Sequence, residues 1–198
     1  ACVELGPADV DPDQVMRAQV TYLEGYLWDP PRAKDAFRKA IRAAKLAGRK
    51  TSLSLSDGFC VDRHRAEFLE LVNGDIDILF ANEAEILSLF EAKDFDEALQ
   101  QARKLPGIVA LTRSEKGSVV INAAGDEVHV VDAAPIEKLV DTTGAGDLYA
   151  AGFLYGLTHG RPLADCARIG GLCAAEIIQQ MGARPQTPLR ESLKGKLG

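Results

Sequence analysis

The chain has 198 residues, of which 46% are hydrophobic, and a formal net charge of −6. This length and apolar content suffice for an α/β domain with a sizeable core. The acidic balance argues against a nucleic-acid backbone or an anionic membrane as partner. No apolar run reaches the roughly 18 residues needed to cross a bilayer, and no signal peptide is visible. We therefore expect a cytoplasmic protein.

Several common sites are disfavoured by the absence of their motifs. The four cysteines include no Cys-x-x-Cys pair, which argues against a zinc site. Cys166 and Cys173 lie on one face of a predicted helix, which is typical of core packing. The sequence contains neither a Gly-x-x-x-x-Gly-Lys-Ser/Thr phosphate loop nor a Gly-x-Ser-x-Gly elbow. ATP binding by the first motif is therefore excluded, and the missing elbow argues against a serine hydrolase.

Helical and extended patterns alternate along the first part of the chain. Apolar spacing and turn signals predict a helix over 11–19, a strand over 20–26, a helix over 31–47 and a strand over 51–55. The second strand ends in the turn Ser56-Asp57-Gly58. Strand ends of open α/β sheets host ligands, although a turn-forming role for Asp57 is the favoured interpretation.

The next apolar strand, over 76–81, runs into Asn82-Glu83-Ala84-Glu85. One interpretation is a capping box, in which Asn82 caps the following helix and Glu85 bonds back to it. The other is that Asn82 and Glu85 face a phosphate-bound Mg²⁺, which takes oxygen ligands and keeps several waters. Spacing alone does not separate the two interpretations.

The second half of the chain continues the alternation. We predict a helix over 95–104, a strand over 108–112, a hairpin of strands over 118–121 and 128–131, a helix over 148–157, a further helix from 161 to 181 and a terminal helix over 189–197. Strands alternating with helices imply a mostly parallel sheet that is covered on both faces.

The stretch Asp141-Thr142-Thr143-Gly144-Ala145-Gly146-Asp147 lies just before the long apolar helix. Its small residues let the backbone approach a ligand, and a helix N-terminus attracts anions. A carboxylate is repelled by an anion, so Asp147 suggests a base that takes a proton from a hydroxyl attacking a phosphate. A tight turn with a dipole-favoured Asp is the alternative. The dinucleotide fingerprint fits poorly, because its third glycine would fall at Tyr149.

The string DTTGAGD resembles the signature of the ribokinase/PfkB family of carbohydrate and nucleoside kinases, and Asn82-x-x-Glu85 matches the second motif of that family. The resemblance implies a ribokinase-like three-layer α/β/α sandwich with a mostly parallel central sheet. It also implies that residues 1–198 form one kinase domain without the N-terminal part and substrate lid of the family. Missing strands would expose apolar surface, so association with a partner or a second copy is expected.

The resemblance implies transfer of the γ-phosphate of MgATP to a primary hydroxyl. Asp147 would be the base, the N–H groups of Gly144, Ala145 and Gly146 would hold the developing charge, and Asn82 and Glu85 would orient Mg²⁺ through water. ATP would also lie against residues that match a Thr-x-Gly-x-x-Gly pattern and a later Gly-Ala pair, with Ser114 in place of the middle glycine. These residues are Thr112, Arg113, Gly117, Gly182 and Ala183. Asp141 and Thr143 would shape the turn or contact a monovalent cation such as K⁺.

The acceptor is predicted from a second resemblance. The stretch from Tyr22 to Arg65 is similar to bacterial members labelled sugar kinases of adenosine-kinase type. We therefore expect adenosine or a related nucleoside, with ribose or a fructose-type sugar as the alternative. A non-catalytic nucleotide-binding module stays open as a third reading. For Gly182, a simple helix C-cap is the alternative to a nucleotide contact.

Overall fold

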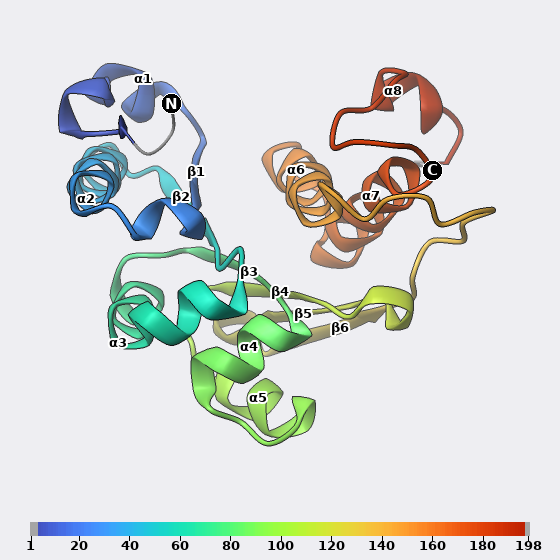
Figure 1. Ribbon diagram of the computed structural model, residues 1–198, viewed down its shortest axis with the longest axis horizontal. Helices are drawn as coiled ribbons and strands as arrows, with labels where there is room; N and C mark the ends of the chain where they lie inside the picture. The colour runs from blue at the N-terminus through green and yellow to red at the C-terminus, as the bar shows by residue number, and fades with distance from the viewer. Residues whose placement is uncertain (1–3, 197–198) are drawn as a thin grey trace. The chain divides into compact units, whose positions relative to one another are not determined.

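The computed structural model describes residues 4–196 and shows an α/β fold (Figure 1). Six strands form one mostly parallel sheet in the order β1-β2-β3-β4-β5-β6. The strands are β1 (Val20–Glu24), β2 (Lys50–Ser54), β3 (Ile78–Asn82), β4 (Ile108–Thr112), β5 (Ser118–Asn122) and β6 (Glu127–Val131). The predicted fold class and mostly parallel sheet are confirmed.

Helices occupy most of the connections between these strands. They are α1 (Pro12–Arg17), α2 (Pro31–Leu46), α3 (Gly58–Gly74), α4 (Glu83–Phe90), α5 (Phe95–Ala102), α6 (Ala145–Thr158), α7 (Leu163–Ile177) and α8 (Leu189–Ser192). The chain divides into two compact units. The N-terminal unit holds the residues up to Leu111 together with Ile121–Glu127, and the C-terminal unit holds Thr112–Val120 together with the residues from Val128 onward.

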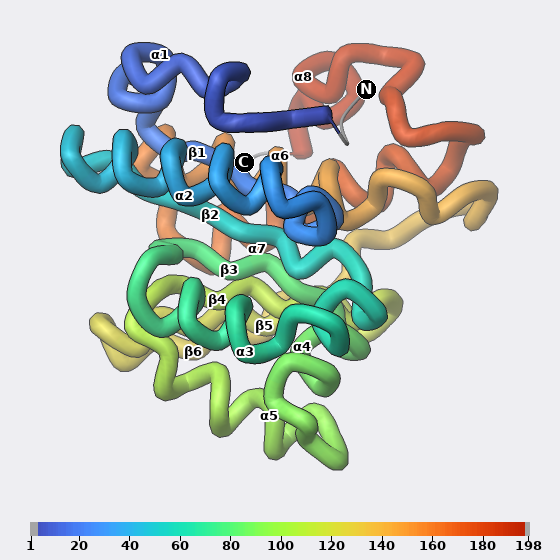
Figure 2. Tube along the Cα trace, turned by 60° about the vertical axis from the view of Figure 1, so that its left-hand side comes forward, coloured from blue at the N-terminus to red at the C-terminus, as the bar shows by residue number. Residues whose placement is uncertain are grey.

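In the N-terminal unit, β1 pairs in parallel with β2, and β2 pairs in parallel with β3. Figure 2 shows α2 and α3 running alongside these strands. The face of α2 that was predicted from apolar spacing is buried, with Ala33, Ala36 and Ala44 fully inaccessible to solvent. Parallel strands place their carboxyl ends at the same edge of a sheet. The ends of β1, β2 and β3 therefore lie at one edge of this unit.

The strand predicted over 20–26 ends two residues earlier, at Glu24. The chain then bends into a short 3₁₀ helix, Gly25–Trp28. A Cβ atom on Gly25 would lie 2.7 Å from the carbonyl oxygens of Ser54 and Leu55, so this bend requires glycine. The backbone at the end of β1 therefore packs directly against the end of β2. A strand pattern in the sequence does not predict this contact.

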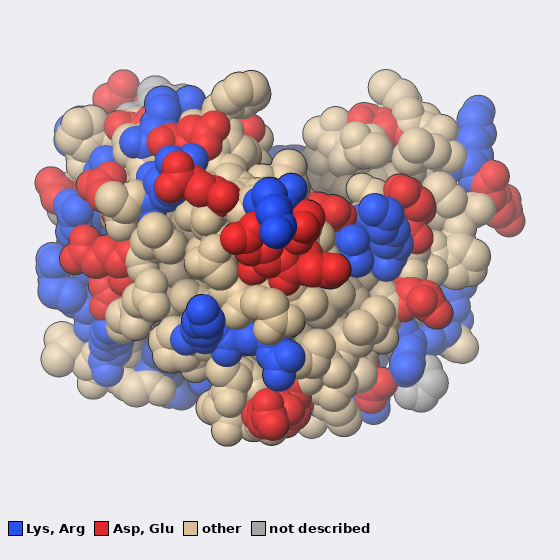
Figure 3. All heavy atoms as spheres, turned by 90° about the horizontal axis from the view of Figure 1, so that it is seen from below, with Lys and Arg blue, Asp and Glu red and all other residues tan. Residues whose placement is uncertain are grey.

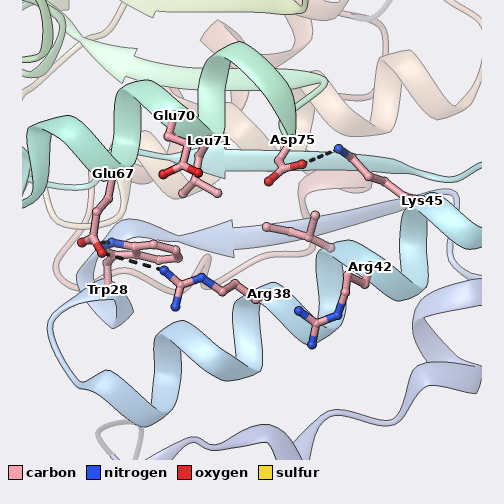
Figure 4. A pocket seen from close by; sticks show the side chains of 9 residues that line it. Trp28, Arg38, Arg42, Lys45, Glu67, Glu70, Leu71 and Asp75 are labelled. Atoms are coloured by element: carbon pink, nitrogen blue, oxygen red, sulfur yellow. Dashed lines mark hydrogen bonds and ion pairs between the residues drawn. The ribbon is translucent and has the colours of Figure 1, made fainter.

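A cavity of about 220 Å³ lies between α2 and α3 in the N-terminal unit (Figure 4). Arg38 pairs with Glu67 at 3.8 Å, and Lys45 pairs with Asp75, so ion pairs link the two sides. Trp28 lines the cavity, and its indole N–H donates to Glu67 at 2.8 Å. None of the predicted site residues lines this cavity.

Charged side chains of both signs are scattered over the face of the molecule drawn in Figure 3, between larger areas of uncharged residues. Lysine and arginine are interspersed with aspartate and glutamate there, rather than gathered in one basic area. Within residues 4–196, no helix is both long enough and apolar enough to span a membrane.

In the C-terminal unit, α6 and α7 pack closely through small residues. A Cβ atom on Gly152 of α6 would lie 2.9 Å from the Cα of Gly170 and 2.8 Å from the Sγ of Cys173. Cys166 and Cys173 are buried in this interface, and burial raises the pKa of each thiol to about 11. The predicted packing role of both cysteines is confirmed.

Replacing Gly152 by Ala should destabilise the protein by about 1–3 kcal/mol, because the new methyl group overpacks the α6–α7 interface. Gly171→Ala is the matched control, since a Cβ there meets nothing within 4 Å. That change should be neutral or stabilising by up to about 1 kcal/mol, because alanine favours the helix. Urea unfolding of both variants measures the difference, and equal effects would contradict the packing described.

Candidate active site

The glycine turn of the DTTGAGD stretch begins α6. The N-cap residue, Gly144, has a φ of +82° and offers no side chain to cap the helix. The helix begins at Ala145, and Asp147 is exposed in its first turn, as predicted. Within the described part of the chain, the N–H groups of Gly146 and Asp147 donate to no protein acceptor. This end of the helix therefore offers free donors next to an exposed carboxylate.

One predicted donor is already engaged. The N–H of Ala145 donates to the Thr142 carbonyl oxygen at 3.1 Å and closes the turn. Ala145 therefore shapes the turn in this conformation, and its N–H is not available to an anion. The backbone N–H of Asp147 is among the donors that remain open, although the sequence pattern does not predict it as a donor.

Asp141 fixes the first half of the turn. Its Oδ1 accepts from the N–H of Thr143 at 2.9 Å and from the Thr143 hydroxyl at 2.7 Å. Its Oδ2 accepts from the N–H of Gly182 at 2.8 Å. These bonds from Thr143 and Gly182 lower the pKa of the Asp141 carboxyl. Asp141 therefore stays ionised and holds the segment at Gly182 beside the turn.

The predicted pair Gly182 and Ala183 lies against the glycine turn. A Cβ atom on Gly144 would be 2.8 Å from the Cβ of Ala183, so the two segments touch. Gly182 has a φ of +84°, but α7 ends at Ile177 with Ile178 as its C-cap. Gly182 is therefore not the C-cap of α7, which had been the alternative interpretation.

The loop after β4 forms a separate tight bend in the C-terminal unit. The N–H of Arg113 donates to the Gly117 carbonyl oxygen at 2.8 Å, beyond the end of β4 at Thr112. Ser114, which replaces a family glycine, takes a left-handed φ of +52°. A Cβ atom on Gly117 would lie 2.0 Å from the Val131 carbonyl oxygen, so packing requires glycine there.

In the N-terminal unit, Asn82 and Glu85 form a capping box at the start of α4. The Asn82 N–H donates to Glu85 Oε2 at 2.9 Å, and the Glu85 N–H donates to Asn82 Oδ1 at 2.9 Å. The Asn82 side-chain amide also donates to Glu85 Oε1 at 2.6 Å. The capping interpretation is confirmed, and a contact of these groups with Mg²⁺ stays a prediction.

Glu85 is an unusual capping residue, because only 5% of its surface is exposed. Burial raises the pKa of its carboxyl to about 7, and the nearby charges of Glu24 and Asp57 add to this shift. The bond from the Asn82 backbone acts in the opposite direction. A carboxyl that titrates near neutrality is common at functional sites. The sequence pattern gives Glu24 no role here, because it predicts only a strand over 20–26.

The raised pKa of Glu85 makes the stability of the protein depend on pH. The folded state keeps this proton up to about pH 7, whereas the unfolded chain releases it near 4.5, the ordinary value for glutamate. Stability should therefore fall as the pH rises through this window, by about 3 kcal/mol from this group. Glu85→Gln, whose side-chain oxygen can still accept from the Asn82 N–H, does not titrate and should lack that part of the slope. Urea unfolding from pH 4.5 to 8 tests this, and equal slopes in both proteins would refute it.

Comparison with known proteins places the chain in a family. Residues 5–190 match the family described as pfkB family carbohydrate kinase, and the chain belongs to that family. The chain is similar to a cytidine kinase of Thermococcus kodakarensis, with 38% identity over 122 residues, which cover 60% of this chain and 42% of that protein.

Two solved structures are closely similar. One is an adenosine kinase from Sinorhizobium meliloti, with 53% identity and a TM-score of 0.95, covering 99% of this chain and 60% of that chain. The other is a probable sugar kinase from Rhizobium etli, with the same identity and TM-score, covering 99% of this chain and 59% of that chain. The chain thus spans about three-fifths of these neighbours.

Proposed function

We propose that the protein transfers the γ-phosphate of MgATP to a primary hydroxyl of a nucleoside, with adenosine as the acceptor. The observation that carries this proposal is the exposed Asp147 carboxylate beside the free N–H groups that begin α6. Family membership supports a phosphotransferase. The names of two similar proteins, an adenosine kinase and a cytidine kinase, support a nucleoside acceptor.

In this proposal, Asp147 accepts the proton of the attacking hydroxyl. An exposed carboxylate can reach a hydroxyl that enters from solvent, and its place in the first helical turn fixes its position. The N–H groups of Gly146 and Asp147, with that of Gly144, hold the negative charge that develops on the transferred group. A Cβ on Gly146 would meet nothing within 4 Å, so no protein atom crowds this side of the turn.

The remaining predicted residues take supporting roles. Asn82 and Glu85 orient Mg²⁺ through water, and their oxygens are the donor type that this ion takes. Thr112, Arg113, Gly117, Gly182 and Ala183 hold the nucleotide. Asp141 and Thr143 contact a monovalent cation such as K⁺, since the Asp141 carboxylate is ionised and keeps part of its acceptor capacity. When bound, MgATP supplies the phosphoryl group and a metal that neutralises its charge.

A sugar acceptor is the second candidate. The probable sugar kinase of Rhizobium etli is as similar to the chain as the adenosine kinase is, with 53% identity. Ribose and fructose-type furanoses carry a primary hydroxyl like that of a nucleoside. We further propose a cytoplasmic location and association into a homodimer.

The test is ADP release from MgATP by the full-length protein, with adenosine, cytidine, ribose or fructose added in turn. Release that depends on adenosine or cytidine supports the nucleoside proposal. Release that depends on ribose or fructose alone supports the sugar alternative. Intact ATP binding with no acceptor-dependent release would refute a kinase and support a nucleotide-binding module.

A further inference from the structure

The turn after β2 contains a strained residue. Ser56 has a φ of +68°, which residues other than glycine rarely adopt. The Asp57 N–H donates to the Leu55 carbonyl oxygen at 2.8 Å, so residues 55–57 form a γ-turn with a positive central φ. This form of γ-turn is rare and strained, and such strain persists only where the surroundings hold it.

Glu24, at the end of β1, holds this turn. The Ser56 hydroxyl donates to Glu24 Oε1, and the Tyr26 N–H donates to the Ser56 hydroxyl oxygen at 3.3 Å. The other carboxylate oxygen of Glu24 accepts from the Tyr22 hydroxyl at 2.9 Å. Glu24 is therefore fixed through both oxygens, and it links the end of β1 to the turn that follows β2.

The turn places Asp57 at the N-cap position of α3. The Asp57 side chain makes no capping bond there, although Asp is a favoured capping residue. In the parallel register of β1, β2 and β3, Glu24 lies opposite Ser54, and Ser54 lies opposite Phe80. The Leu55 N–H donates to the Phe80 carbonyl oxygen at 3.1 Å, so the turn that carries Asp57 begins beside the end of β3. Glu24, Asp57 and Glu85 therefore lie at the ends of three adjacent strands, and a strained turn places one of them.

We propose that Glu24 is a positioning residue, which acts through Ser56 to hold Asp57 near Glu85 at the carboxyl ends of β1, β2 and β3. This inference rests on the proposed function, because the fixed carboxylates would face the hydrated cation of the nucleotide. Glu24 itself is occupied by Tyr22 and Ser56 and does not contact the substrate.

The test uses Glu24→Ala in the full-length protein. The Mg²⁺ concentration at half-maximal rate should rise about tenfold, which corresponds to the free energy that a strained residue typically stores. The kcat at saturating Mg²⁺ should stay within about twofold. Adding Ser56→Gly should restore part of the Mg²⁺ response, because glycine adopts the positive φ without strain. Glu70→Ala, at an exposed acid on α3, is the control and should change nothing.

Amide hydrogen exchange separates this role from general stabilisation and does not depend on activity. In Glu24→Ala, exchange should accelerate over residues 55–58 and remain unchanged in β3. Unchanged exchange at 55–58, or acceleration across the whole N-terminal unit, would overturn the positioning role. An unchanged Mg²⁺ response in an active Glu24→Ala enzyme would also overturn it. A wild-type protein without kinase activity would refute the proposed function, and the exchange result would still decide whether Glu24 holds the turn.

Discussion

Replacing Asp147 by Asn should lower kcat for acceptor phosphorylation by about 100- to 10,000-fold, the usual contribution of a general base. Asparagine has nearly the same shape but cannot accept the proton of the attacking hydroxyl. The glycine turn should persist, because the side-chain hydrogen bonds that hold it to Thr143 and Gly182 come from Asp141 and not from Asp147. ATP affinity should therefore change little. Steady-state kinetics and calorimetric titration with ATP measure the two effects separately.

Asp165→Asn is the matched control for this prediction. Asp165 is also an acidic residue in the first turn of a helix, in this case α7, and it pairs with Arg168 at 2.8 Å. Its replacement removes the same charge from a similar position and should leave kcat unchanged. If Asp147→Asn retained near-normal turnover, or if both variants lost activity equally, Asp147 would not be the base.

Gly144→Ala should destabilise the protein by about 1–3 kcal/mol and abolish most of its activity. Two causes act together at this position. The φ of +82° disfavours any L-residue, and the new Cβ would lie 2.8 Å from the Cβ of Ala183. To relieve the contact, the turn must move away from the segment at Gly182 and Ala183. The donors at the start of α6 then lose their positions.

Two further glycine variants separate the causes. Gly160→Ala carries a similar backbone strain, with a φ of +70°, but its Cβ meets nothing within 4 Å. It should cost stability and leave kcat intact. Gly146→Ala has open space and should leave stability nearly unchanged, yet its methyl group should obstruct the phosphoryl group and lower activity. Thermal unfolding measures the stability of the three glycine variants, and steady-state kinetics measures their kcat. Full activity in Gly144→Ala would contradict the proposed site.

Local patterns predicted the elements of the fold well. The spacing of Ala33, Ala36 and Ala44 determined the buried face of α2, because helical periodicity depends only on neighbours in sequence. Asp11 likewise caps α1, with its Oδ1 accepting from the Asp13 N–H at 2.9 Å. The α/β class and the mostly parallel sheet follow from the alternation of such elements.

The sequence was less informative wherever distant segments meet. The strand at residue 24 ends early because Gly25 contacts the end of β2, some thirty residues away. The same contact brings Glu24 to Ser56, and neither residue belongs to a recognisable motif. The burial of Glu85 is also a tertiary property, which its place in a capping box does not reveal. Within the glycine turn, only the structure shows that the Ala145 N–H is engaged.

The most direct test of phosphoryl transfer is ³¹P NMR of the products formed from MgATP and adenosine by the full-length protein. We predict a phosphomonoester on the primary hydroxyl of adenosine, formed in equal amount to ADP, and its loss in Asp147→Asn. Release of ADP with inorganic phosphate alone would contradict transfer to an acceptor. A wild-type level of phosphomonoester in Asp147→Asn would contradict the role assigned to this carboxylate.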